Sequence, residues 1–299
     1  MRILVTGATG FVGGSLAERL VHAGHEVRCL VRDRGRASHL AALGCELHEG
    51  DVLEPASMQG AGTGIDVAYY LVHSMGRGEA GDYRTKDIEA ARAFGGMARQ
   101  EGVERVMYLG GLGDRPQSEH LRSRHETAQA LAAEGPALTY FRAAMVVGAR
   151  SESYRTLRYL VERLPAMIAP AWIKTLTQPI AIDDVLAYLE QAPQVPASMG
   201  REVQIGGPDV LSYGEMLDRM ADVLERPHRP KVPVPFLSPR LSSLWIGLVT
   251  PVDAGVARPL VEGLSTTTVV TDPLPAAAFD VQPMNFDEAL RRARAEDTS

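Results

Sequence analysis

Three glycines near the start of the chain, Gly7, Gly10 and Gly13, are spaced as GxxGxxG. They follow an apolar run at residues 3–5 that predicts a buried strand, and they precede a segment with an apolar face that predicts a helix. Glycines let the backbone turn sharply and let a pyrophosphate approach closely, while the free N–H groups and the dipole of the helix favour an anion. The strand, the glycine turn and the helix together predict a dinucleotide site.

The end of the second predicted strand, residues 26–31, indicates which dinucleotide binds. NAD sites use an acidic side chain there to accept hydrogen bonds from the ribose 2′-OH, whereas an arginine pairs with the 2′-phosphate of NADP. Val31 stands where the acid would be, and Arg32 follows it. We therefore expect NADP(H), with Arg32 at the 2′-phosphate. The alternative is that the arginines of this loop are only solvated.

Asp51 and Val52 follow the third predicted strand, residues 45–48. A carboxylate at Asp51 would accept a hydrogen bond from the adenine amino group while Val52 packs against the ring; a helix cap is the alternative. Cofactor contacts are predicted on the glycine turn, at the ends of the strands and on one later helix. They are Gly7, Thr9, Gly10, Phe11, Val12, Gly13, Arg32, Asp51, Val52, Leu71, Val72, His73, Leu109, Gly110, Arg124 and Ala143.

Strand and helix patterns alternate through the first half of the chain, which predicts a parallel sheet covered on both faces. The expected fold is α/β, with a doubly wound Rossmann-type sheet and a smaller mixed α/β C-terminal lobe. We expect an NADP-binding domain at residues 1–150, to which residues 178–206 return, and a substrate or lid lobe at residues 151–299. Asp183 and Asp184 are expected to cap the helix that follows them.

The composition narrows the function classes. A net charge of −6 over 299 residues argues against a nucleic-acid surface, and no apolar run approaches the ~20 residues that span a bilayer. Two cysteines, Cys29 and Cys45, are interpreted as buried structural thiols, and the histidines show no metal-binding spacing, so no metal is expected. We expect a cytoplasmic protein, a monomer or homodimer, that acts on a small-molecule substrate.

Several motifs resemble those of the extended and atypical short-chain dehydrogenase/reductase superfamily. They lie at residues 6–13 (TGATGFVG), 50–52 (GDV), 102–109 (GVERVMYL), 180–185 (IAIDDV) and 205–209 (IGGPD). More narrowly, residues 69–75 (YYLVHSM) and 108–113 (YLGGLG) resemble the NmrA-like NAD(P)-binding branch. The resemblance covers nearly the whole chain and implies a substrate cleft between the two lobes.

The resemblance also implies that the usual catalytic set is missing. Catalytic members of the superfamily use a Tyr in YxxxK and a Ser after the fifth strand. In this chain the Ser positions fall on Gly110 and Gly111, the Tyr position on His120 and the Lys position on Arg124. Arg124 remains suited to the ribose hydroxyls, and the glycine pair would open space beside the nicotinamide; a simple strand-end turn is the alternative.

Three side chains are candidates to replace the missing acid or base. His120 is the first, because imidazole exchanges protons near neutral pH. His73 follows the fourth strand, at the sheet edge where ligands bind in such folds, and Asp87 falls at the position of the superfamily's active-site Asn. Surface or capping roles are the alternative for each. The expected substrate pocket contains Gly111, Met145, Tyr154, Tyr159 and Trp172, with core packing as the alternative for the aromatic residues.

Three functions fit these expectations. The first is an NADPH-dependent oxidoreductase without the usual Ser-Tyr-Lys set, which reduces a small planar or unsaturated substrate such as a quinone or a C=C or C=N bond. The second is a non-catalytic NADP(H)-sensing regulator that resembles NmrA. The third is an isomerase or epimerase that retains its nicotinamide cofactor. The expected aromatic pocket favours the enzyme.

Overall fold

The computed structural model describes residues 1–72, 82–113, 119–169, 171–233 and 264–297. A seven-stranded sheet in the order β11-β6-β5-β4-β1-β2-β3 forms its centre, and every neighbouring pair is parallel. The strands of this sheet are β1 (Arg2–Thr6), β2 (Glu26–Val31), β3 (Glu46–Glu49), β4 (Val67–Tyr70), β5 (Arg105–Gly111), β6 (Ala137–Ala143) and β11 (Glu202–Ile205). The predicted Rossmann-type fold is confirmed.

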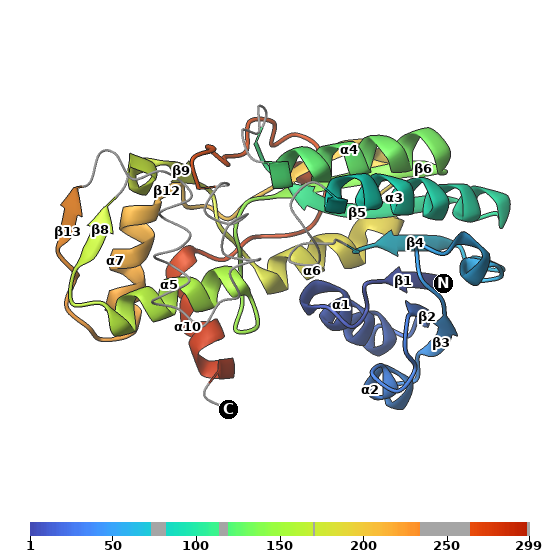
Figure 1. Cartoon of the computed structure of the whole chain (residues 1–299), viewed down its shortest axis with the longest axis horizontal. Helices are drawn as coiled ribbons and strands as arrows, with labels where there is room; N and C mark the ends of the chain where they lie inside the picture. Colours follow the sequence, from blue (N-terminus) through green and yellow to red (C-terminus); the bar gives the residue numbers. More distant parts are fainter. Residues whose placement is uncertain (73–81, 114–118, 170, 234–263, 298–299) are drawn as a thin grey trace.

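Helices cover both faces of the sheet because its strands carry apolar side chains on both sides. In β1, Ile3 and Val5 enter one hydrophobic cluster and Leu4 enters the other, as the alternation of a strand requires. α1 (Phe11–His22) and α6 (Ile182–Gln191) pack on the first face, and α3 (Asp82–Gln100) and α4 (Glu119–Glu134) pack on the opposite face (Figure 1). The short α2 (Ser38–Ala42) follows β2.

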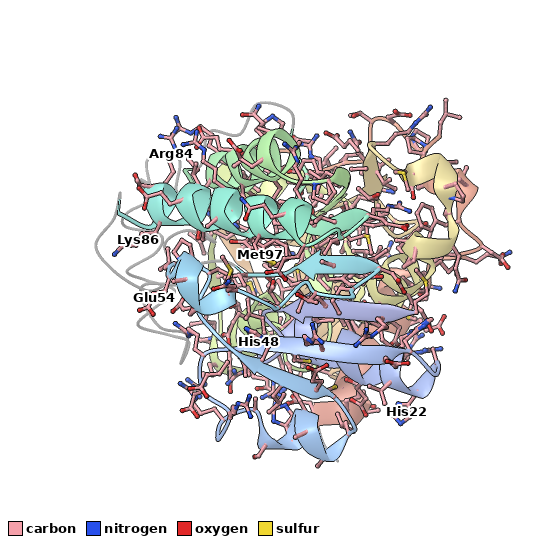
Figure 2. All side chains as sticks on the ribbon, turned by 90° about the vertical axis from the view of Figure 1, so that its right-hand side faces the viewer. His22, His48, Glu54, Arg84, Lys86 and Met97 are labelled. Atoms are coloured by element: carbon pink, nitrogen blue, oxygen red, sulfur yellow. The ribbon has the colours of Figure 1, made fainter. Side chains whose placement is uncertain are left out.

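The face that a helix turns to the sheet follows from its apolar spacing. In α3, Phe94, Met97 and Ala98 are buried in the cluster that contains Ala68 of β4. Figure 2 shows Met97 between this helix and the strands, while Arg84 lies on the outside near the start of the helix. The outer face can therefore carry charges at no desolvation cost.

Apart from β11 and α6, which belong to the sheet and its covering helices, the second half of the chain forms a smaller group of elements beyond one end of the sheet (Figure 1). α5 (Glu152–Arg163), α7 (Tyr213–Val223) and α10 (Phe286–Asp297) share a third hydrophobic cluster. Short paired strands connect this group, namely β7 (Val146–Val147) with β10 (Ile180–Ala181), β9 (Leu176–Thr177) with β12 (Leu211–Ser212), and β8 (Met167–Ala169) with β13 (Lys231–Pro233). The 3₁₀ helices are η1 (Pro55–Met58), η2 (Ala171–Lys174), η3 (Ala192–Gln194), η4 (Pro196–Ser198) and η5 (Ala276–Ala278).

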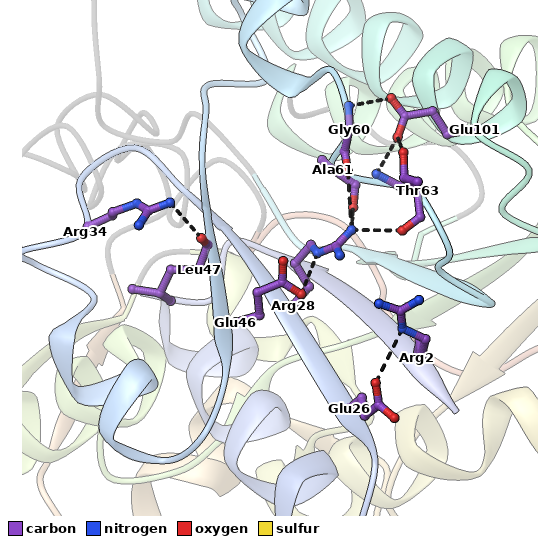
Figure 3. A network of polar contacts seen from close by, with 11 residues as sticks. Arg2, Glu26, Arg28, Arg34, Glu46, Leu47, Gly60, Ala61, Thr63 and Glu101 are labelled. Atoms are coloured by element: carbon purple, nitrogen blue, oxygen red, sulfur yellow. Dashed lines mark hydrogen bonds and ion pairs between the residues drawn. The ribbon is translucent and has the colours of Figure 1, made fainter.

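A buried arginine fastens the loop that leads into β4. Arg28 of β2 donates from Nη1 to the carbonyls of Gly60, Ala61 and Thr63 at 2.9–3.2 Å, and it pairs with Glu46 of β3 (Figure 3). Glu101, just after α3, accepts the N–H groups of Gly60 and Gly62 at 2.7 Å. These bonds satisfy loop groups that would otherwise be buried without partners. These hydrogen bonds lie at the amino ends of the strands, which is the end of the sheet opposite to the glycine turn.

Candidate functional site

The glycine turn after β1 has a shape that only glycine fits. Gly7 has a φ of +68°, and a Cβ on it would lie 2.4 Å from the carbonyl oxygen of Leu71. A Cβ on Gly13 would lie 2.3 Å from the carbonyl oxygen of Gly7. The N–H of Gly10 donates to that same carbonyl at 2.9 Å and closes the turn. The turn is thus pressed against both α1 and the segment after β4.

The helix that follows leaves its first N–H groups available. Gly10 is the N-cap of α1 and supplies no side-chain acceptor, and the first turn contains no acidic residue. The amino end of a helix carries a partial positive charge and unpaired N–H donors, which together attract an anion. The geometry suits a phosphate group of a dinucleotide, and the bare cradle of glycines gives it close access to the backbone.

A cavity of about 630 Å³ begins at this turn and continues past the ends of β4, β5 and β6 into the C-terminal group of helices. Of the predicted cofactor and substrate residues, the structure brings fourteen to its wall. They are Gly7, Gly10, Phe11, Val12, Gly13, Leu71, Val72, Leu109, Gly110, Arg124, Ala143, Gly111, Met145 and Trp172. His120, the first catalytic candidate, lines the same cavity.

α4 carries His120 and Arg124 one helical turn apart, so both lie on one face of the helix. Arg124 donates from Nη1 to the carbonyl of Leu109 at 3.4 Å, and its Nε–H is buried and without a hydrogen-bond partner in the part of the chain that the structure describes. Tyr108 also lines the cavity; burial raises its pKa, and the nearby charge of Arg124 lowers it to a smaller extent. The tyrosine is therefore a neutral hydroxyl at physiological pH.

Side chains of the protein occupy the Cβ direction of both glycines at the end of β5. A Cβ on Gly110 would lie 2.7 Å from the Tyr140 ring, and a Cβ on Gly111 would lie 2.6 Å from Leu121. In the direction of their missing Cβ atoms, the glycines make room for two side chains of the protein, and open room beside the nicotinamide stays a prediction. Both glycines still line the cavity through their backbone.

An arginine that sequence reasoning had not placed in the site holds this segment. Arg142 of β6 donates to the carbonyls of Gly111 at 3.1 Å and Gly113 at 2.8 Å, and it pairs with Glu202 of β11 at 2.6 Å. Its side chain is only 7% exposed. A charge buried to this extent is retained where it is paired and hydrogen-bonded. A charged residue within an otherwise apolar strand was the sequence signal that could have predicted this buried, paired arginine.

Two predicted pocket residues lie elsewhere, and for these the expectation is corrected. Tyr154 is fully buried in the cluster of α5, α7 and α10, and Tyr159 lies beneath the guanidinium groups of Arg158 and Arg163. The cavity is instead lined by another face of α5, with Ser153, Thr156, Leu157 and Leu160. The 3–4 spacing of these residues was visible in the sequence, but the neighbour of that face was not.

The remaining catalytic candidates are not brought to the cavity within the described residues. Asp87 accepts a hydrogen bond from Ser123 at 3.1 Å and so joins α3 to α4; this role replaces the expected catalytic one. His73 lies outside the described residues. Across the part of the chain that is described, no cluster of three or more His, Cys, Asp or Glu could hold a metal ion.

The residues predicted to hold the adenosine half lie outside the cavity wall. Arg32 is exposed and makes no hydrogen bond or ion pair with the described residues. Arg34 donates to the carbonyl of Leu47 (Figure 3), and it also pairs with Glu49. Asp51 accepts the N–H of Leu53 at 3.0 Å in a local turn, and it is not the N-cap of the following η1, which is Glu54. Of the others, Val52 is buried and Thr9 is exposed. Their contacts with a cofactor stay predictions.

Among the described segments, no helix is both long enough and apolar enough to cross a lipid bilayer.

Comparisons with known proteins agree with this architecture. The photosystem II assembly factor Ycf39 of Cyanophora paradoxa is 31% identical over 48% of this chain and 44% of its own length, so the chain spans less than half of that relative. The NAD(P)H azoreductase of Xenophilus azovorans is 24% identical over 76% of this chain and 75% of its own. The triphenylmethane reductase of Citrobacter sp. has a TM-score of 0.77 and 19% identity, with 98% of this chain and 99% of the other covered. The profile of the NmrA-like family matches residues 1–237, and the chain therefore belongs to the NmrA-like family.

Proposed function

We propose that the protein is an NADPH-dependent oxidoreductase that reduces a small planar or unsaturated organic acceptor. The observation that carries the proposal is one continuous cavity of about 630 Å³, which joins the glycine turn to an apolar lobe. A cavity of this size is typical of sites for small molecules. A protein that only senses its dinucleotide would not need the part of the cavity that extends beyond the sheet.

The residues present fit a dinucleotide. The backbone N–H groups at the start of α1 would bind the pyrophosphate, and the bare glycine turn leaves room for it. Leu71, Val72, Leu109 and Ala143 would lie against the nicotinamide half, and Arg32 would pair with the 2′-phosphate. When bound, NADPH supplies the hydride.

The chain's own polar groups would complete the reduction of a quinone. One hydride and one proton convert a quinone to a hydroquinone, and His120 is positioned to hold that proton at the cavity wall. Arg124 would donate hydrogen bonds to the ribose hydroxyls or to the developing oxygen anion of the acceptor, since its Nε–H has no partner among the described residues. An acceptor with an activated, conjugated double bond tolerates the loss of the usual Tyr better than a simple ketone does.

The relatives support this reaction class. By their names, the two enzymes mentioned above act on azo compounds and on triphenylmethane dyes, respectively. The fold is shared with the second of these, and this chain itself matches the NmrA-like family profile. The transfer of the reaction class to this chain is part of the proposal.

The test is a fluorescence titration with NADPH and NADH, followed by a panel of quinones and imines monitored at 340 nm. We expect tighter binding of NADPH than of NADH and oxidation of NADPH by at least one acceptor. Arg32→Ala should weaken NADPH binding at least tenfold and leave NADH binding unchanged, because only NADPH carries the 2′-phosphate. Arg34→Ala is the matched control, since its guanidinium is engaged by Leu47 and Glu49.

Each other outcome has a defined meaning. Tight binding without oxidation of NADPH by any acceptor would contradict the reductase and favour the sensor or the isomerase. An equal loss of NADPH and NADH affinity in Arg32→Ala would overturn the assignment of the 2′-phosphate. No binding of either dinucleotide would refute the site itself.

A further inference from the structure

The far end of the cavity is built differently from the end at the sheet. We call it the distal arm and define it by six residues of α5, α7, η2 and a later segment. They are Leu157, Leu160, Trp172, Tyr213, Leu217 and Leu264. None of them carries a formal charge at neutral pH, and burial raises the pKa of Tyr213 to about 12. The charged residues of the cavity wall, Arg124, Arg150 and Glu152, lie outside this set.

The arm lies inside a hydrophobic core, where empty space is unusual. Leu157, Leu160, Tyr213 and Leu217 are each less than 10% exposed, and all belong to the cluster that joins α5, α7 and α10. Protein interiors are close-packed, so helices that can approach one another normally close such a space. Here α5 and α7 pack together and still leave a cavity between their apolar side chains and the sheet. The space is therefore available to an apolar occupant.

The helix faces make the arm elongated. Ser153, Thr156, Leu157 and Leu160 recur at 3–4 spacing along α5, so the cavity follows this helix for two turns from its amino end. The polar members are at the start, near the sheet, and the leucines follow. A ligand that extends along α5 therefore passes from polar to apolar surroundings.

We propose that the substrate carries an apolar chain and that the distal arm binds this chain while the reducible ring lies beside Gly110, His120 and Arg124. The inference rests on the proposed reductase function and adds a substrate class to it. A charged or strongly polar substituent is disfavoured, because it would lose its hydration among uncharged side chains whose one buried, unpartnered donor within the described residues is the Trp172 Nε1–H. This excludes substrates whose phosphate groups would have to enter the arm.

The test compares a methyl-substituted and a hexyl-substituted 1,4-benzoquinone with NADPH. Each methylene that leaves water contributes about fourfold to binding, so we expect kcat/KM for the hexyl quinone to be at least tenfold higher. Leu160→Trp should fill the arm and bring the ratio of the two kcat/KM values to within about twofold. Tyr159→Trp, an enlargement on the same helix but off the cavity, should keep the wild-type ratio.

A second readout does not depend on turnover. The chain has two tryptophans, so in a Trp245→Phe background Trp172 in the wall of the arm is the only one, and quinones quench tryptophan fluorescence. The hexyl quinone should quench it at a concentration at least tenfold lower than the methyl quinone. Such quenching without NADPH oxidation would support the arm and contradict the reductase. Equal quenching by both quinones, or equal kcat/KM with Leu160→Trp reducing both alike, would overturn the arm even if both were reduced.

Discussion

At the scale of single residues, His120 is the side chain on which the chemistry depends most. It lies near the start of α4 and lines the cavity one turn before Arg124. General acid catalysis by a positioned imidazole typically contributes a factor of about 10²–10⁴. We therefore expect His120→Ala to lower kcat with a quinone by about that factor while the NADPH affinity from fluorescence titration stays unchanged.

A nearby histidine provides the control for this prediction. His125 is on the same helix, but it is exposed, and its ring lies against Tyr140 rather than in the cavity wall. His125→Ala should leave kcat within about twofold of the wild type. Unchanged turnover in His120→Ala would remove this residue from the mechanism and leave water as the proton source.

Residue identity alone could not show how the glycine pair is used. Gly110 and Gly111 line the cavity, and their place at the end of a buried strand, where ligands bind in such folds, was visible in the sequence. Whether the space over them stays open depends on Tyr140 of β6 and Leu121 of α4, which are distant in sequence from the pair. The role of Arg142 could not be predicted for the same reason, because its partners Gly111, Gly113 and Glu202 come from two other segments of the chain.

At the scale of elements, the glycine turn and α1 act as one unit whose shape can be tested. Gly13 and Gly96 are both helical glycines, but a Cβ on Gly13 would meet the Gly7 carbonyl at 2.3 Å, whereas a Cβ on Gly96 of α3 would meet nothing within 4 Å. We expect Gly96→Ala to raise the free energy of unfolding by about 0.5–1 kcal/mol, because alanine favours the helix. Gly13→Ala should lower it by more than 1 kcal/mol.

Urea unfolding at constant m-value measures both changes, and an NADPH titration measures the function of the turn. Gly13→Ala should weaken NADPH binding at least tenfold, since the displaced Gly7 carbonyl belongs to the turn that receives the pyrophosphate. Gly96→Ala should bind NADPH like the wild type. If both variants were equally stable and bound NADPH equally, the close approach of α1 to the turn would not matter.

Elements were more predictable than the faces they use. α5 begins at Glu152 because Ser151 caps it, and its apolar residues recur at helical spacing, which is visible in the sequence. Periodicity tells which residues of α5 share a face, but it does not tell what each face meets. Tyr154 is therefore buried in the core, and the face of α5 with Leu157 and Leu160 lines the cavity.

At the scale of the whole molecule, the chain after Leu264 fastens the smaller group of helices to the sheet. Asp184 of α6 accepts the N–H of Met284 at 3.0 Å, and Asp209 accepts the N–H of Phe286 at 2.8 Å at the start of α10. The expectation that Asp184 caps α6 is corrected, because Ala181 is the N-cap and the Asp184 carboxylate binds the distant segment. Such a connection requires the folded chain and is invisible in the local sequence.

This connection makes stability depend on pH. Burial, more than the neighbouring Asp183, raises the pKa of the Asp184 carboxyl from its ordinary value of 3.8 to about 6. The fold therefore favours the protonated form, and the free energy of unfolding should fall as the pH rises from about 4 to about 6 and then stay level. The fall is up to about 3 kcal/mol, since each pH unit in that window is worth about 1.4 kcal/mol.

Asp184→Asn removes the buried charge and keeps an oxygen that can accept the Met284 N–H. Urea unfolding at pH 4, 5, 6 and 7.5 should therefore show a flatter profile for this variant, with higher stability than the wild type above pH 6. Asp183→Asn is the control, because this neighbour is 40% exposed and pairs with Arg292 at the surface, so it should keep most of the wild-type slope. If the stability of the wild type rose between pH 4 and pH 6 instead of falling, other carboxyl groups would dominate its pH dependence. If Asp184→Asn and the wild type had identical profiles, Asp184 would ionise in the folded protein at no cost in stability.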